Sequence, residues 1–193
     1  FTSVAITLLI LLWPEYQSGK IYEVLLSDNK SFLFEKSEVA QSSFMQTTPE
    51  SSFIQAVKKE NLAEVERFID EGVDLELKDL IGYTPLMHAV KQQNTELVKL
   101  LAEYGANVDT SDGLEDTPLV WASSMKNEAI VKVLLEHGAD PDKGNFSPLM
   151  WAAYYGNLRL VKMFLESRAN LNSRTNEGWT ALMWAAERGN LQV

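Results

Sequence analysis

The chain contains two histidines, and neither has a second potential ligand at a spacing suited to a metal site. His137 directly precedes a glycine, which is typical of a helix C-terminus, where a partly positive side chain is favourable. The sequence has no cysteine, no glycine-rich phosphate loop and no nucleophile elbow. The acidic pairs Glu115-Asp116 and Asp140/Asp142 read as solvated loop carboxylates. These residues predict neither an active site nor a bound metal or cofactor.

The composition and charge of the chain indicate which classes of partner it could bind. The chain has 193 residues, of which 46% are hydrophobic and 23% charged, which describes a folded protein rather than a disordered one. Its formal net charge of -10 and pI near 4.7 argue against nucleic acid, because binding a phosphate backbone needs clustered Lys and Arg. An acidic surface is compatible with solubility alone or with a basic partner.

A short motif recurs along the chain and predicts the helices that position its side chains. It reads TPLMHA at 84–89, TPLVWA at 117–122, SPLMWA at 147–152 and TALMWA at 180–185, with a weaker copy, SSFIQA, at 51–56. Successive alanines of the four clear copies are 33, 30 and 33 residues apart. This period and motif resemble the ankyrin repeat. The resemblance covers about 48–193 and implies an all-α solenoid of stacked helix-turn-helix units with β-hairpin fingers.

The repeated residue types have physical roles in such a unit. Thr or Ser caps a first helix and proline occupies its first turn, while asparagine caps the second helix. Leu86, Leu119, Leu149 and Leu182 are expected in the core, and the motif alanines let helices approach closely. Glycines at 72, 105 and 138 follow second helices where the backbone needs a positive φ, and Arg168 takes that place in the fourth repeat.

We expect three regions along the chain. Residues 1–19 carry the apolar run from Val4 to Trp13 and are typical of an export signal or membrane anchor, with a buried core element as the alternative. Residues 20–47 read as a small β-hairpin region and linker. Residues 48–193 form the repeat domain, divided near 48–80, 81–113, 114–143, 144–176 and a truncated 177–193. The finger at 141–146 is three residues short, and both chain ends look cut.

The resemblance implies where a partner would bind. The position before the motif alanine faces the concave groove in the family, and here it is Gln55, His88, Trp121, Trp151 and Trp184. Large aromatic side chains on such a surface are typical binding anchors, although these tryptophans could instead pack on neighbouring helices. Finger tips and first-helix ends are the family's other contact positions. The predicted partner-binding set is therefore His88, Trp121, Trp151, Trp184, Leu80, Ile81, Tyr83, Leu114, Asp116, Phe146, Trp179, Met125, Tyr154, Tyr155 and Arg188.

The expected function is a protein–protein interaction module, acting as a scaffold, an inhibitor or a targeting adaptor rather than as an enzyme. Two alternatives stay open at this point. The chain could be the recognition arm of an enzyme whose catalytic domain lies outside these residues, or its tryptophans could bind a glycan by stacking on sugar faces. We expect no cofactor, no nucleic-acid partner and membrane contact only through the N-terminal segment. An exported, periplasmic, secreted or membrane-anchored location, as in bacterial members of the family, is favoured over a cytoplasmic one.

Overall fold

The computed structural model describes residues 49–193, which belong to a compact unit comprising Thr47–Val193. The apolar run at 1–19 and the predicted hairpin at 20–47 lie outside the described residues. Within the described part, every regular element is a helix.

The first helices of the repeats begin where the motif predicts. They are α4 Pro49–Lys58, α6 Pro85–Lys91, α8 Pro118–Ser124, α10 Pro148–Tyr155 and α12 Ala181–Glu187. The hydroxyl of the capping residue accepts a hydrogen bond from the third helical N–H in α6, α8, α10 and α12, and the caps are Thr84, Thr117, Ser147 and Thr180. Three of these helices have proline at their first position, where no N–H donor is needed. The predicted helix starts are confirmed.

The second helices are α5 Leu62–Asp70, α7 Thr95–Glu103, α9 Glu128–Glu136 and α11 Leu158–Glu166. Each is capped by an asparagine side chain, as predicted, at positions 61, 94, 127 and 157. The residue after each second helix's C-cap lies at positive φ, and Arg168 occupies it in the fourth repeat at 62°. No helix follows Asn190 in the described residues, and its amide donates instead to the carbonyls of Ala153 and Tyr154.

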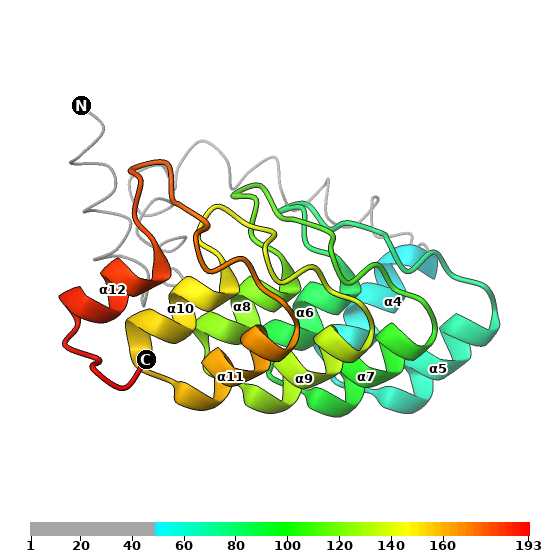
Figure 1. The fold of residues 1–193 in the computed structure, drawn as a ribbon. Helices are drawn as coiled ribbons and strands as arrows, with labels where there is room; N and C mark the ends of the chain where they lie inside the picture. Colours follow the sequence, from blue (N-terminus) through cyan, green and yellow to red (C-terminus); the bar gives the residue numbers. More distant parts are fainter. Residues whose placement is uncertain (1–48) are drawn as a thin grey trace, which may run out of the picture. The chain divides into compact units, whose positions relative to one another are not determined.

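Figure 1 shows these helices in two layers, with α4, α6, α8, α10 and α12 in one row and α5, α7, α9 and α11 in the other. The core lies between the rows, and Leu86, Leu119 and Leu149 are almost fully buried there. The prediction for Leu182 is wrong, because this side chain is 72% exposed. In the preceding repeats the first helix packs against its own second helix. No such helix follows α12 in the described residues, so this side of α12 stays open.

The fingers contain no strand in the part of the chain that the structure describes, which corrects the prediction of β-hairpin fingers. At the base of the finger before α6, Asp79 N–H donates to Tyr83 C=O, and Gly82 N–H donates to Asp79 C=O. The return bond from Tyr83 N–H goes to the Asp79 carboxylate rather than to its carbonyl. Asp112 and Thr175 do the same in two later fingers. A side chain therefore replaces one bond of a strand pair, and the pairing does not extend.

Acidic side chains join successive fingers. The carboxylates of Glu76, Asp109 and Asp142 accept the backbone N–H of Asn107, Asp140 and Asn170, at 2.7, 3.0 and 2.7 Å. The Asp140 carboxylate accepts the N–H of Asp142 within its own finger. Asp140 and Asp142 are exposed, as expected of solvated loop carboxylates, but their carboxylates also bond to the finger backbone. Part of the chain's negative charge holds neighbouring fingers in register, because each carboxylate satisfies a loop N–H.

Candidate partner-binding surface

The residue before each motif alanine lies on the first-helix layer, and its exposure changes along the stack. Gln55 is exposed, His88 and Trp121 are buried, and Trp151 and Trp184 are half-buried. Because the capping residue fixes where each first helix begins, these side chains occupy equivalent positions in successive repeats. They form one row across α4, α6, α8, α10 and α12.

A second row interleaves with the first. It consists of the residues directly before the helix caps, namely Tyr83, Asp116, Phe146 and Trp179. The Tyr83 ring lies between two members of the first row, with centroids 5.7 Å from His88 and 4.8 Å from Trp121. Phe146 lies in the same way, 4.6 Å from Trp151 and 5.3 Å from Trp184. We call the two rows together the aromatic ladder.

The ladder continues beyond these rings at its α10–α12 end. Trp179 lies 4.6 Å from Trp184, and Trp151 stacks on Tyr155 with centroids 5.8 Å apart. Tyr154 contacts Trp151, Trp184 and Tyr155 edge-on. Offset and edge-on pairs of this kind add stability beyond the area they bury. This end of the ladder is therefore a single packed group of rings.

Two cations cover rings at the same end. The Arg188 guanidinium lies 3.9 Å above the Tyr154 ring and also donates to the Tyr154 hydroxyl. Lys126 Nζ lies 4.5 Å above the ring of Tyr155, whose pKa is raised by burial. Tyr155 is 38% exposed and Arg188 is exposed, so both reach solvent next to the packed rings.

Three of the four tryptophans of the ladder have a buried donor without a partner. Nε1 of Trp121, Trp151 and Trp184 is buried and has no hydrogen-bond partner among the described residues. Buried indole N–H groups usually find an acceptor, and leaving one unpaired costs about 1–3 kcal/mol. The ladder is thus stabilised by ring packing rather than by hydrogen bonds to the indoles.

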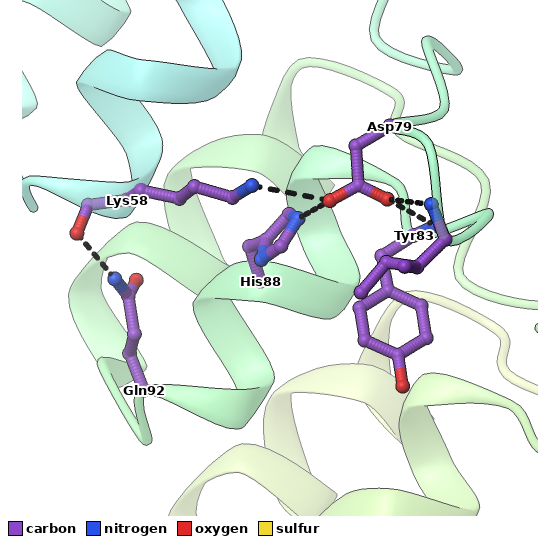
Figure 2. Close-up of polar contacts among 6 residues, drawn as sticks. Lys58, Asp79, Tyr83, His88 and Gln92 are labelled. Carbon is purple, nitrogen blue, oxygen red and sulfur yellow. Dashed lines mark hydrogen bonds and ion pairs between the residues drawn. The ribbon is translucent and has the colours of Figure 1, made fainter. Parts of the chain in front are cut away.

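The α4–α6 end of the surface is polar, as Figure 2 shows. One carboxylate oxygen of Asp79 contacts both Lys58 Nζ, at 3.1 Å, and His88 Nε2, at 2.8 Å. The other oxygen accepts the backbone N–H groups of Ile81 and Tyr83. Gln92 Nε2 donates to the Lys58 carbonyl at 2.7 Å, which ties α6 to α4. Asp79 therefore links the first repeat to the finger and first helix of the second.

The charge states of this cluster follow from its surroundings. Burial alone would raise the pKa of Asp79, but bonds from Tyr83 N–H, Lys58, His88 and Ile81 N–H together lower it. Burial lowers the pKa of His88, with Lys58 contributing, despite the bond from Asp79 that raises it. A neutral His88 donates from Nε2, because the Asp79 carboxylate can only accept. The cluster holds a carboxylate and a neutral imidazole in a structural contact between repeats.

Comparison with protein families identifies the family to which this stack of helices belongs. Residues 53–145 match a family model described as ankyrin repeats (3 copies), and residues 149–193 match one described as ankyrin repeats (many copies). The chain belongs to the ankyrin-repeat family. A search of curated proteins found no match to the chain. Ankyrin repeats are protein-interaction modules, which gives the aromatic ladder its functional context.

In this ankyrin-repeat domain, the predicted contact residues differ in their access to a partner. Tyr83, His88 and Trp121 are buried, so they shape the surface from beneath. Asp116, Met125, Phe146, Trp151, Tyr154, Trp179 and Trp184 are half-buried. At the finger tips, Leu80 is fully exposed, and Ile81 and Leu114 are 48% exposed. The structure brings His88, Tyr83 and Trp121 together at one end of the ladder and Phe146, Trp151, Tyr154, Tyr155, Trp179, Trp184 and Arg188 at the other.

Sequence reasoning missed Lys58 and Asp79. A signal for Asp79 was present, because it lies five residues before the capping Thr84, as Asp112 does before Thr117 and Thr175 before Thr180. These side chains all accept a finger N–H. For Lys58 there was no comparable signal, since its contact spans 21 residues and depends on how α4 and the finger pack.

The described residues contain no group of three or more His, Cys, Asp or Glu side chains that could hold a metal ion. None of the helices in this range is both long and apolar enough to cross a membrane.

Proposed function

We propose that this ankyrin-repeat domain binds a partner protein through the α8–α12 end of the aromatic ladder and the adjoining finger tips. The observation that carries this proposal is the exposed edge of a packed ring group, where Tyr155 stacks on Trp151 beside Tyr154 and Arg188. Tyrosine, tryptophan and arginine are the residues most often found at binding hot spots.

The packing of the ladder favours binding for an energetic reason. Phe146 and Tyr155 already contact Trp151, so its ring needs no reordering when a partner arrives. Ordering a flexible side chain at an interface costs about 0.5–1.5 kcal/mol. Rings held by their neighbours avoid most of that cost, which is the advantage of a preorganised surface.

The polar α4–α6 end has a different role in this proposal. Lys58 and His88 both bond to the Asp79 carboxylate, and His88 is buried. Groups whose hydrogen bonds are already made gain little from a partner, because binding would exchange one bond for another. We place the main contact at the aromatic end and assign the polar cluster to holding the first two repeats together.

The biological role would be that of a scaffold, an inhibitor or a targeting adaptor. If the chain is instead the recognition arm of a larger enzyme, the same surface would select the substrate or regulator. The glycan alternative gains no support from the ladder. Sugar rings stack on open aromatic faces, whereas Trp151 is flanked by Phe146 and Tyr155, and Trp184 by Phe146 and Trp179.

For the location we propose that residues 1–19 direct export or anchor the chain at a membrane. The support is the uncharged apolar run from Val4 to Trp13 in the sequence. Fractionation of source cells, with the protein detected by antibody, tests this directly. Recovery in the soluble cytoplasmic fraction alone would contradict it.

A capture experiment tests the binding proposal. The bait is the chain from Lys20 onward, and one variant carries Leu114→Ser and Tyr155→Ser, which remove exposed apolar groups at the proposed surface. A matched variant carries Tyr104→Ser and Leu165→Ser, which are similarly exposed but belong to the second-helix side. We expect a protein captured by the wild type to be lost with the first variant and kept with the second. Loss with only the second variant would move the site to the other face.

A further inference from the structure

One member of the second row of the aromatic ladder is not aromatic. Tyr83, Phe146 and Trp179 each precede a helix cap and contact the ladder residue five positions later, and the first two also contact that of the next repeat. Asp116 occupies the same position before the cap Thr117. By this register it falls between Trp121 and Trp151. A carboxylate therefore stands where the neighbouring repeats have a ring.

The Asp116 carboxylate has no hydrogen bond or ion pair among the described residues. Only its backbone takes part in the finger, with its N–H donating to the Asp112 carboxylate and its carbonyl accepting from Asp112 N–H. The side chain is half-buried. Burial, together with the charge of Asp112, raises the pKa of Asp116 to about 7. A half-buried carboxylate without a partner is unusual, because burying a charge is costly unless it is paired.

In the part of the chain that the structure describes, the lysines that contact this finger or the neighbouring ladder are bonded elsewhere. Lys78 Nζ donates to the carbonyl of Ser111, and Lys143 Nζ donates to that of Asp109 at 2.7 Å. Lys126 lies over the Tyr155 ring. Among the described residues, these three cations are therefore not available to Asp116, and the chain's net charge of -10 favours a basic partner.

We propose that Asp116, in its register position between Trp121 and the half-buried Trp151, forms a seat for an arginine side chain of the partner protein. This inference rests on the proposed function and names the chemistry that its central contact would recognise. A guanidinium matches a carboxylate with two parallel hydrogen bonds, which a lysine ammonium cannot form equally well. Asp116 would thus determine specificity at the one position of the second row that lacks an aromatic ring.

Titration with a small probe tests this. The probe is N-acetyl-arginine amide, added to the ¹⁵N-labelled chain while the indole N–H signals of the tryptophans are followed, each assigned from a Trp→Phe variant. We expect saturable shifts of the Trp151 and Trp121 signals at millimolar probe, and smaller shifts at Trp179 and Trp184. Asp116→Asn should weaken this binding about tenfold, because the amide keeps the shape but loses the charge. Shifts that are absent, or equal in wild type and Asp116→Asn, would overturn the proposal.

Two controls test whether the binding depends on the Asp116 charge and on the guanidinium group. Glu115→Gln removes the same charge from an exposed neighbour on the same finger and should leave the titration unchanged. N-acetyl-lysine amide should bind at least several-fold more weakly, and an equal response would overturn the choice of arginine. In the capture experiment, a partner kept at wild-type strength by Asp116→Asn but lost with the Leu114/Tyr155 variant would overturn this inference and leave the proposed function standing.

Discussion

The ring of Tyr83, at the base of one finger, lies 4.8 Å from that of Trp121 on the first helix of the next repeat, at an interplanar angle of 86°. The two residues are joined by packing across a repeat boundary rather than by sequence proximity. Phe146 and Trp184 repeat this relationship two boundaries later. Tyr83 and Phe146 therefore each couple their own repeat to the following one, and the ladder that presents the proposed surface also helps to hold the stack together.

Phe146→Ala tests this coupling. The substitution removes a ring that contacts both Trp151 and Trp184, so it weakens packing within one repeat and between two. Because Phe146 is half-buried, we expect a loss of about 2 kcal/mol in the free energy of unfolding, below the 3–5 kcal/mol typical of a fully buried phenylalanine. Denaturant unfolding followed by circular dichroism measures it. Leu80→Ala, at a fully exposed finger tip, should change stability by less than about 0.5 kcal/mol.

Two of the motif leucines, Leu149 and Leu182, allow a matched comparison of core and exposed positions. Leu149 is 4% exposed and Leu182 is 72% exposed, although they hold the same place in successive repeats. We expect Leu149→Ala to cost about 2–5 kcal/mol and Leu182→Ala less than about 1 kcal/mol, because only the first leaves a cavity. Urea unfolding of the two variants decides it. Equal losses would mean that the α12 face is covered in solution.

Much of the fold could be predicted from the sequence because local chemistry determines it. The caps at Thr84 and Thr117, and the asparagine caps of the second helices, are single-residue signals whose hydrogen bonds lie within one helical turn. The finger structure could not be predicted in the same way. The Asp79 carbonyl accepts the N–H of Gly82, so Tyr83 N–H bonds to the Asp79 carboxylate, and the sequence does not indicate this division between two acceptors of one residue.

The chain reversals within repeats were only partly predictable. The sequence located them, but it did not indicate that Glu60, Gln93 and Lys126 adopt positive φ values of 56°, 57° and 60°. Glycine takes that place in the later repeats, at Gly156 and Gly189. In each turn the N–H of the following asparagine donates to the carbonyl of the motif alanine, which holds the strained backbone in place. The sequence predicted the row that contains Trp121, Trp151 and Trp184. It predicted the residues before the caps as partner contacts, but not that their rings lie between members of that row.

Replacing Arg168 with glycine should stabilise the fold. It lies at a φ of 62° in the position where Gly72, Gly105 and Gly138 end the other second helices. A side chain in the left-handed region costs about 1 kcal/mol, so Arg168→Gly should raise the free energy of unfolding by about 0.5–1 kcal/mol. Thermal unfolding measures the gain. Lys132→Gly, on the exposed face of α9, should instead cost about 1 kcal/mol. A destabilising Arg168→Gly would show that its side chain makes a contact that outweighs the strain.

The effect of Asp116→Asn on the free energy of unfolding should depend on pH. The pKa of Asp116 is about 7 in the folded chain, compared with about 3.9 for an unfolded aspartate. The protonated carboxyl therefore contributes stability that is complete below about pH 4 and is lost as the pH rises through 7. Since asparagine does not titrate, its stability advantage over the wild type should grow by at least about 1 kcal/mol between pH 5 and pH 8.

Urea unfolding of both proteins at the two pH values gives this difference. Glu115→Gln corrects for the general effect of removing one negative charge, because it removes an exposed carboxylate from the same finger. An advantage of Asp116→Asn that is equal at pH 5 and pH 8, or no larger than that of Glu115→Gln, would show that burial does not raise the pKa of Asp116.

Site-specific photo-crosslinking tests the central claim, that the aromatic ladder and finger tips bind a partner protein, most directly. A photoreactive phenylalanine derivative replaces Tyr155 or Leu114 at the proposed surface, or Tyr104 or Leu165 on the second-helix side, in cells of the source organism. All four side chains are between 38% and 52% exposed, so the positions are comparable. We predict that positions 155 and 114 crosslink to the same protein and that positions 104 and 165 do not. Crosslinks from 104 or 165 alone would contradict the account.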